Sequence, residues 1–108
     1  MNDRGTPDTT RVTSTDERIR RRVRVTGRVQ GVGFRESCRR EAQHLGVAGT
    51  VSNRGDGSVE AVFEGTTPAV DRIVAWCRQG PRSAHVRDVA VTVERPVGEV
   101  GFRISFSA

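Results

Sequence analysis

The sequence predicts an α+β protein whose elements follow the order βαββαβ, with one short edge strand added near the C-terminus. Three observations support this order. Valines alternate with polar residues in two separate segments, two other segments carry an apolar stripe of helical period, and a glycine-rich turn separates two short strand-like segments. Such chains form a ferredoxin-like split-βαβ sandwich, in which two helices pack on one face of an antiparallel sheet.

The first half of this order begins with a strand around Val23 and Val25, which alternate with arginines and give one face to the core. A loop containing three glycines follows the strand. The next segment is predicted as a helix that Gly46 closes. One apolar stripe of helical spacing runs along it: Phe34, Cys38, Ala42 and Leu45.

The second half begins with strands at residues 47–53 and 58–64, joined by a hairpin turn with the sequence RGDG. Thr67 is expected to cap a second helix with Pro68 at its first position, and Gly80 to follow its end. Alternating apolar residues then predict two last strands, at Val89, Val91 and Val93 and at Phe102, Ile104 and Phe106.

The chain has 108 residues, which is enough for one domain. Residues 1–20 mix Asp, Thr, Arg, Gly and Pro without apolar periodicity, so we expect a disordered polar tail at 1–20 and one folded domain at 21–108. No apolar leader or membrane-spanning run occurs, and the two cysteines lack metal-ligand spacing. We therefore expect a cytoplasmic protein without a bound metal.

All basic residues that give the net charge of +5 are arginines. The absence of lysine excludes a Walker A loop and Schiff-base chemistry. The basic charge and the βαββαβ order leave an RNA-binding module as an alternative class. Such modules stack bases on exposed aromatics of the central strands, where this sequence offers only Phe63, whose parity with Val59 and Ala61 predicts burial. Specific nucleic-acid binding is therefore not expected.

The stretch GRVQGVGFR, residues 27–35, joins the first strand to the first helix. A glycine-rich loop that enters a helix presents backbone N–H groups at the positive end of the helix dipole, which suits an anion. The third glycine of a dinucleotide motif would fall at Glu36, so the expected anion is a small phosphate. Arg35 could pair with it bidentately. A tight turn followed by a surface arginine is the alternative.

Asn53 is the second candidate, because it closes a strand just before the hairpin turn, and in a split-βαβ sheet that strand can lie near the first. An amide cannot act as a base, but it can accept from and donate to a water and so orient it for attack. An asparagine that only serves the turn is the alternative.

Three blocks, VRVTGRVQGVGFR, GTVSNRGDGSVE and GPRSAHVRDVAV, resemble the acylphosphatase family in order and spacing, and the resemblance spans residues 22–106. It implies a monomeric hydrolase, without cofactor, that splits the carboxyl–phosphate bond of a small acyl phosphate and releases inorganic phosphate. Arg35 corresponds to the phosphate-binding arginine and Asn53 to the water-orienting asparagine of the family. The phosphate nest corresponds to the backbone of Gln30, Gly31, Val32, Gly33 and Phe34.

Thr50 departs from the family pattern, which usually has a tryptophan there. We expect this change to affect strand packing more than chemistry. The resemblance also leaves two alternatives open: a domain derived from a carbamoyl-transfer enzyme, and a domain that has acquired a binding or regulatory role.

Overall fold

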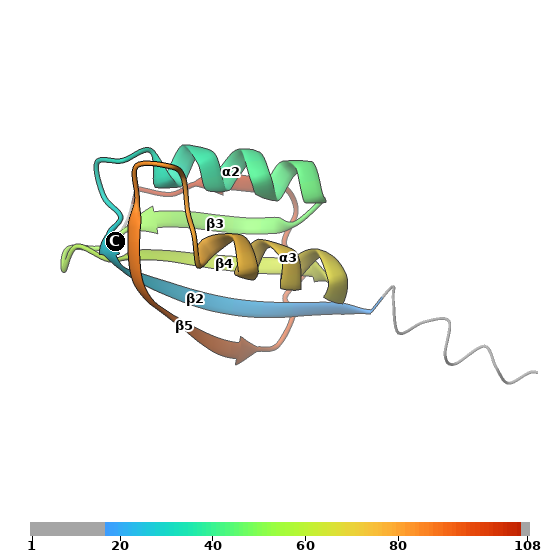
Figure 1. Cartoon of the computed structure of the whole chain (residues 1–108). Coiled ribbons are helices and arrows are strands. Elements are labelled where there is room, and N and C mark those ends of the chain that lie inside the picture. The colour runs from blue at the N-terminus through green and yellow to red at the C-terminus, as the bar shows by residue number, and fades with distance from the viewer. Residues whose placement is uncertain (1–16, 107–108) are drawn as a thin grey trace, which may run out of the picture.

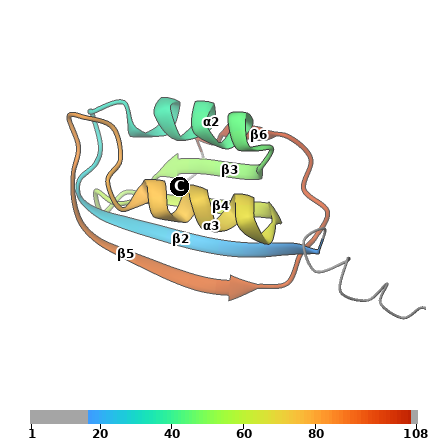
Figure 2. The same ribbon diagram turned by 45° about the vertical axis from the view of Figure 1, so that its right-hand side comes forward.

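The computed structural model describes residues 17–106 as one five-stranded sheet with two helices. Both helices lie on the same face of the sheet (Figures 1 and 2). This arrangement confirms the predicted ferredoxin-like α+β class and the βαββαβ order with an added edge strand. The elements are β2 (Arg18–Arg28), α2 (Phe34–Leu45), β3 (Ala48–Asn53), β4 (Val59–Thr66), α3 (Thr67–Cys77), β5 (His85–Glu94) and β6 (Phe102–Ile104).

The strands lie in the order β5-β2-β4-β3-β6. The pairs β5–β2, β2–β4 and β4–β3 are antiparallel, whereas β3 and β6 are parallel. The sheet is therefore mixed, and the expectation of a purely antiparallel sheet is wrong at this edge. The reason is that β5 and β6 occupy opposite edges, so that residues 95–101 cross one end of the sheet and β6 starts from the end at which β3 starts.

The first strand begins earlier than predicted. β2 starts at Arg18, whose register partner is Thr66 of β4, so the predicted boundary between residues 20 and 21 falls inside the strand. Arg20 is buried, because its guanidinium lies among carboxylates of β4, β5 and the segment after β5. Residues 1–16 of the predicted tail lie outside the described residues.

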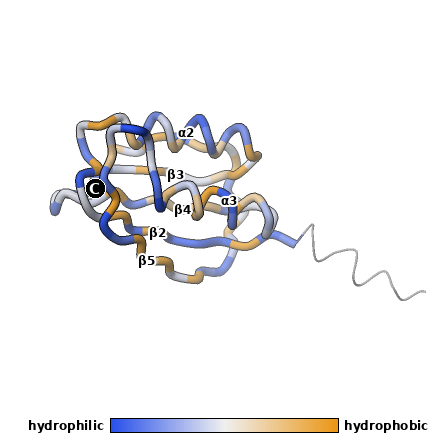
Figure 3. Tube along the Cα trace, in the orientation of Figure 1, coloured by the Kyte–Doolittle hydropathy of each residue, from blue (hydrophilic) through white to orange (hydrophobic). Residues whose placement is uncertain are grey.

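The core lies between the sheet and the helices, where the predicted stripes meet. Val23 and Val25 of β2 and Phe63 of β4 have no exposed surface, and Cys38 and Ala42 of α2 pack in the same cluster. Hydrophobic and hydrophilic segments alternate along α2 in Figure 3, as in an amphipathic helix. The burial of Phe63 confirms the prediction made from its parity.

The helices end where the sequence predicts, except that the N-cap of α3 lies one residue earlier. Gly46 ends α2 in the left-handed region at a φ of 74°, and Val47 N–H donates to the Ala42 carbonyl at 2.9 Å. The cap of α3 is Thr66 and not Thr67, since Thr66 Oγ1 accepts from Ala69 N–H at 3.4 Å. Thr66 ends β4 in an extended conformation, as an N-cap residue requires, which places the cap one residue earlier than predicted.

The segment that crosses the end of the sheet is held by Glu64, whose side chain is completely buried on β4. Its carboxylate accepts from the N–H groups of Val97 at 3.1 Å, Gly98 at 2.7 Å and Glu99 at 3.2 Å, and from the Arg20 guanidinium at 3.1 Å. Burial alone would raise the pKa of Glu64, but these donors outweigh it and lower the pKa below its usual range. The buried carboxylate is therefore ionised and fixes the crossing segment.

Paired charges cover the face of the sheet opposite the helices. Arg22 pairs with Glu60 and Glu94, and Arg54 also pairs with Glu60. No exposed aromatic side chain is found on β2 or β4, so the described part of this face offers no surface for stacking bases. Neither helix within residues 17–106 is long and apolar enough to span a membrane.

Thr50 lies on the same open face, since its position alternates with that of the buried Val51. Its register partners are Val62 of β4 and Arg103 of β6. The departure at Thr50 is thus on the side of the sheet that faces away from the helices.

Candidate functional site

The glycine loop and the β3–β4 hairpin lie at the same end of the sheet, at the left of Figure 1. A pocket of about 190 Å³ opens at this end, between the loop, the start of α2, the end of β3 and the residues after β6. It brings together most of the predicted site residues. Its lining consists of Val29, Gly31, Gly33, Phe34, Arg35, Glu36, Asn53, Ile104 and Phe106.

Two glycines give the loop its shape. Gly31 and Gly33 adopt φ angles of 74° and 81°, in the left-handed region that other residues rarely adopt. A Cβ atom at either position would meet no atom within 4 Å, so the backbone conformation, and not lack of space, requires glycine there. The loop is thereby curved, and it enters the helix at Gly33, its N-cap residue.

The loop is tied to its neighbours on two sides. Gln30 Nε2 donates to the carbonyl of Arg54 at 2.8 Å and to that of Ser58 at 2.9 Å, which joins the loop to the hairpin. Ser83 Oγ donates to the Val32 carbonyl at 3.0 Å, which joins it to the α3–β5 connection. Gln30 and Val32, both predicted in the phosphate nest, are not in the pocket lining, and the side chain of Gln30 is a tether.

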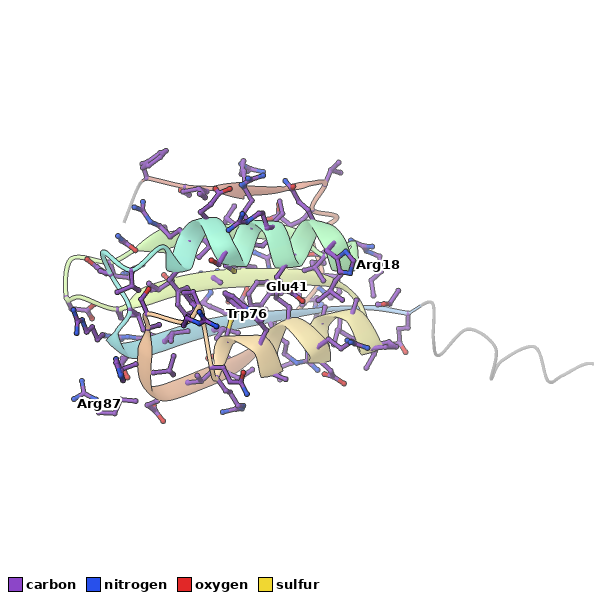
Figure 4. The ribbon with its side chains drawn as sticks, turned by 45° about the horizontal axis from the view of Figure 1, so that its top comes forward. Arg18, Glu41, Trp76 and Arg87 are labelled. Carbon is purple, nitrogen blue, oxygen red and sulfur yellow. The ribbon has the colours of Figure 1, made fainter. Side chains whose placement is uncertain are left out.

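The start of α2 carries no side-chain cap, because its N-cap residue is glycine. The N–H groups of its first turn are therefore not used by a capping side chain, and they lie at the positive end of the helix dipole. The position of this helix end is fixed by Phe34, which is buried. The centre of its ring lies 5.2 Å from the centre of the Trp76 ring. Trp76, labelled in Figure 4, belongs to α3, so this ring contact joins the two helices. Gly80 lies so close to the ring of Phe34 that a Cβ atom added at residue 80 would be 2.8 Å from this ring.

Arg35 lies in the first turn of α2 and lines the pocket. Its guanidinium carbon lies 5.8 Å from the ring centre of Phe106. No carboxylate among residues 17–106 pairs with it, although five other arginines, at positions 20, 22, 24, 39 and 54, have carboxylate partners. This cation is available to an anion in the pocket.

Asn53 ends β3 on the face that carries the buried Val51, and its side chain lines the pocket. Its Oδ1 atom is buried and has no hydrogen-bond partner among the described residues. The turn is closed by other groups: Asp56 Oδ1 accepts from Ser58 N–H at 3.0 Å, and Arg54 N–H donates to the Ser58 carbonyl at 2.8 Å. The side chain of Asn53 therefore does not serve the turn, which was the alternative interpretation of this residue.

The route by which Asn53 reaches the pocket differs from the one expected. β3 is not next to β2, because β4 lies between them. The loop after β2 instead leads into α2, which packs on β3 and β6, so that Arg35 at the start of α2 and Asn53 at the end of β3 line the same pocket.

Ile104, Phe106 and Glu36 also line the pocket, which the sequence patterns did not indicate. β6 pairs with β3 so that Ile104 lies beside Val51, and Ser105 N–H donates to the Val51 carbonyl at 2.8 Å. Two residues further along each chain segment, Phe106 reaches the pocket wall that Asn53 also lines. Glu36 bonds Arg39, and this bond lowers the pKa of Glu36, so its carboxylate is charged.

The remaining candidates lie elsewhere. Cys38 and Cys77 are free and buried in the core, and the hydrogen bond with Cys77, together with burial, raises the pKa of Cys38. His44 and His85 are exposed and do not line the pocket. Among residues 17–106, no three His, Cys, Asp or Glu side chains come together in a group that could hold a metal ion.

The fold and the pocket define a small ferredoxin-like α+β protein with its site where a glycine loop meets a helix. The acylphosphatase family model matches residues 21–104. An acylphosphatase of Trichormus variabilis is 55% identical over 86 residues, which cover 80% of this chain and 85% of the relative. An acylphosphatase of Thermococcus kodakarensis is 50% identical over 88 residues, which cover 82% and 97%.

A solved structure supports the same assignment. The crystal structure of acylphosphatase from Bacillus subtilis matches with a TM-score of 0.78 at 40% identity, covering 81% of this chain and 98% of that one. The chain belongs to the acylphosphatase family. Members of this family are enzymes that hydrolyse acyl phosphates, so the chain is a hydrolase whose substrates are small acyl phosphates.

Proposed function

We propose that this chain hydrolyses the carboxyl–phosphate bond without a metal or cofactor, that the glycine loop and Arg35 hold the phosphate, and that Asn53 orients the attacking water. One observation carries the proposal. The amide of Asn53 has a buried, unpartnered oxygen and lines the same pocket as an unpaired arginine and the uncapped start of a helix. A polar side chain left without a protein partner in such a place is expected to find one in the bound reactants.

The phosphate is bound by groups that need little rearrangement. The backbone N–H groups from Gln30 to Phe34 form the nest, and the left-handed conformation of Gly31 and Gly33 turns the chain around the anion. Arg35 adds a planar fork with several donors, which matches two phosphate oxygens. Because these donors are fixed before the substrate arrives, they stabilise the charge that develops on the phosphoryl oxygens at little reorganisation cost.

The reaction itself is a single displacement. A water oxygen, oriented by the amide of Asn53, attacks phosphorus on the side opposite the acyl group. The bond between phosphorus and the bridging oxygen breaks, and its electron pair leaves with the carboxylate. One proton of the water moves to a non-bridging oxygen of the same phosphoryl group, so a dianionic acyl phosphate and water give a carboxylate and dihydrogen phosphate. No side chain has to act as a base or a nucleophile.

The test is hydrolysis of benzoyl phosphate in water labelled with heavy oxygen, with and without a chelator. We expect equal rates in both samples and the label in the released phosphate. A label in the carboxylate would show attack at the carbonyl carbon. A loss of turnover in chelator that one added metal restores would show that a metal takes part, and either result would contradict the proposal.

We also propose the properties that accompany this function. The chain acts as a monomer in the cytoplasm, a setting that suits its two free buried thiols. The catalytic unit is the folded domain at 21–108 together with Arg18, Ile19 and Arg20, which belong to β2. Residues 1–16 are not needed for turnover. The paired charges on the open face support the expectation that the chain does not bind nucleic acid specifically.

A further inference from the structure

The pocket has a second wall that the proposed chemistry does not use. The phosphate, the water and their ligands account for the loop, Arg35 and Asn53. Ile104 and Phe106, from the segment that begins with β6, line the same pocket and bring no hydrogen-bonding side chain to it. An acyl phosphate has a second part, the acyl group, and this wall is the apolar surface that the pocket offers to it.

Phe106 is unusual among the apolar residues of the pocket, because 83% of its surface is exposed. Ile104 and Phe34, in contrast, pack against or within the core. An exposed aromatic ring contributes little to folding, but at the mouth of a pocket it can cover an apolar group of a ligand. The Phe106 ring lies 5.8 Å from the guanidinium carbon of Arg35, so it is next to the group that we propose binds the phosphate.

The charges around the pocket narrow the kind of acyl group further. Arg35 is the single cation in the pocket lining within the described residues, and the phosphate uses it. Glu36, the other charged residue of the lining, is an anion that already pairs with Arg39. Arg103 of β6 lies on the open face, since its register partner is Thr50. An acyl group with its own negative charge therefore finds no free cation in this lining.

We infer that Ile104 and Phe106 form an acyl-binding wall that selects acyl phosphates with an uncharged, apolar acyl group, aryl groups above all. This inference rests on the proposed function of the same pocket. The wall contacts the part of the substrate that does not react. The binding free energy from this contact is therefore the same in the bound substrate and in the transition state. Its loss should raise KM for aryl substrates and lower kcat much less.

The experiment compares benzoyl phosphate with acetyl phosphate in the wild type and in Phe106→Ala. Both compounds react at the same bond and differ in the acyl group. We expect Phe106→Ala to lower kcat/KM for benzoyl phosphate by about five- to tenfold, the range expected for one lost aromatic contact, and for acetyl phosphate by less than about twofold. Phe106→Leu, which keeps an apolar side chain, should recover part of the difference.

Val100→Ala is the matched control. Val100 is as exposed as Phe106, at 84%, and precedes β6, but it does not line the pocket. We expect this variant to keep the wild-type ratio of the two substrates. If Val100→Ala shifts the ratio as Phe106→Ala does, the effect comes from the C-terminal segment in general and the inference is wrong.

Equal losses for both substrates in Phe106→Ala would also overturn the inference, because they would mean that the ring only positions Arg35. No loss for either substrate would overturn it as well.

A binding measurement separates this inference from the proposed function. In calorimetric titrations, benzylphosphonate should bind the wild type more tightly than methylphosphonate, and Phe106→Ala should remove the difference. If the wild type hydrolyses neither acyl phosphate but shows this difference, the proposed function fails and the apolar wall stands.

Discussion

Replacing Asn53 with alanine should remove most of the activity and leave the fold intact. The substitution takes away an amide that makes no hydrogen bond to the described residues and whose oxygen is buried in the pocket wall. It leaves the glycine loop, Arg35 and the backbone pairing of residue 53 with Val59 in place. The variant therefore separates the orientation of water from the binding of phosphate.

The expected magnitudes follow from these contacts. Loss of a group that only positions a reactant costs on the order of a hundredfold in kcat, or about 2.7 kcal/mol in the activation free energy. The inhibition constant of inorganic phosphate should stay within about twofold, because the anion keeps its own ligands. A buried polar atom without a partner costs free energy in the native state, so alanine should leave the free energy of unfolding within about 1 kcal/mol of the wild type, or raise it. This limit corresponds to a melting-temperature shift of at most about 8 °C.

Asp56→Ala is the partner experiment, since Asp56 lies in the same hairpin and serves the turn. Its carboxylate accepts from the N–H and the hydroxyl of Ser58 and pairs with Arg24. We expect Asp56→Ala to lower the melting temperature and to keep kcat close to the wild type. The assays are steady-state hydrolysis of benzoyl phosphate, competition with inorganic phosphate, and thermal melts of both variants.

A folded Asn53→Ala protein with normal kcat would refute the reasoning. So would a variant in which kcat and phosphate affinity fall together, because Asn53 would then be a ligand of the phosphate. If activity falls only in proportion to the fraction of folded protein, the role of Asn53 is structural.

Arg35→Gln and Arg35→Lys should both abolish competitive inhibition by inorganic phosphate along with turnover, because an ammonium cannot replace a bidentate fork; unchanged inhibition constants would place the phosphate elsewhere. Because the pKa of Glu64 is lowered in the fold, its stabilising effect is present above its unfolded-state pKa of about 4.3 and is lost as the pH falls through the folded pKa. Glu64→Gln should therefore melt earlier than the wild type at neutral pH, and the gap should narrow below about pH 4; a constant gap would contradict this. Cys38 and Cys77 should not react with a thiol reagent until denaturant is added, since both are buried and the pKa of Cys38 is raised by its bond with Cys77 and by burial. Deletion of residues 1–16 should leave kcat/KM unchanged, and a large rise in KM would show that they help to hold substrate.

The local structure was predictable because it depends on neighbouring residues. The alternation of Val23 and Val25 and the stripe that includes Phe34 and Ala42 gave the correct elements, and both sets of side chains are in the core. The cap of α3 was misplaced by one residue because Thr66 and Thr67 are equally suitable caps. Which of them takes this role depends on where β4 stops pairing with β2, and periodicity does not specify this.

The long-range features were not predictable in the same way. The sequence places Arg35 and Asn53 in two motifs, but not the strand order that inserts β4 between β2 and β3. The parallel pairing of β6 with β3, which brings Phe106 to the pocket, depends on a crossing from one edge of the sheet to the other. The polar sequence around Arg20 is typical of a tail, and only its carboxylate partners, at positions 64, 94 and 99, explain its burial.

The crossing segment at residues 95–101 also bears on the order in which the protein folds. β6 pairs with β3 at one edge of the sheet, although the preceding strand, β5, lies at the opposite edge, and Glu64 of β4 anchors the segment between them. Contacts between segments far apart in the sequence require chain entropy to be lost before they form, so we expect β6 to dock late in folding. We then expect Ile104 and Phe106 to reach the pocket after the glycine loop and Asn53.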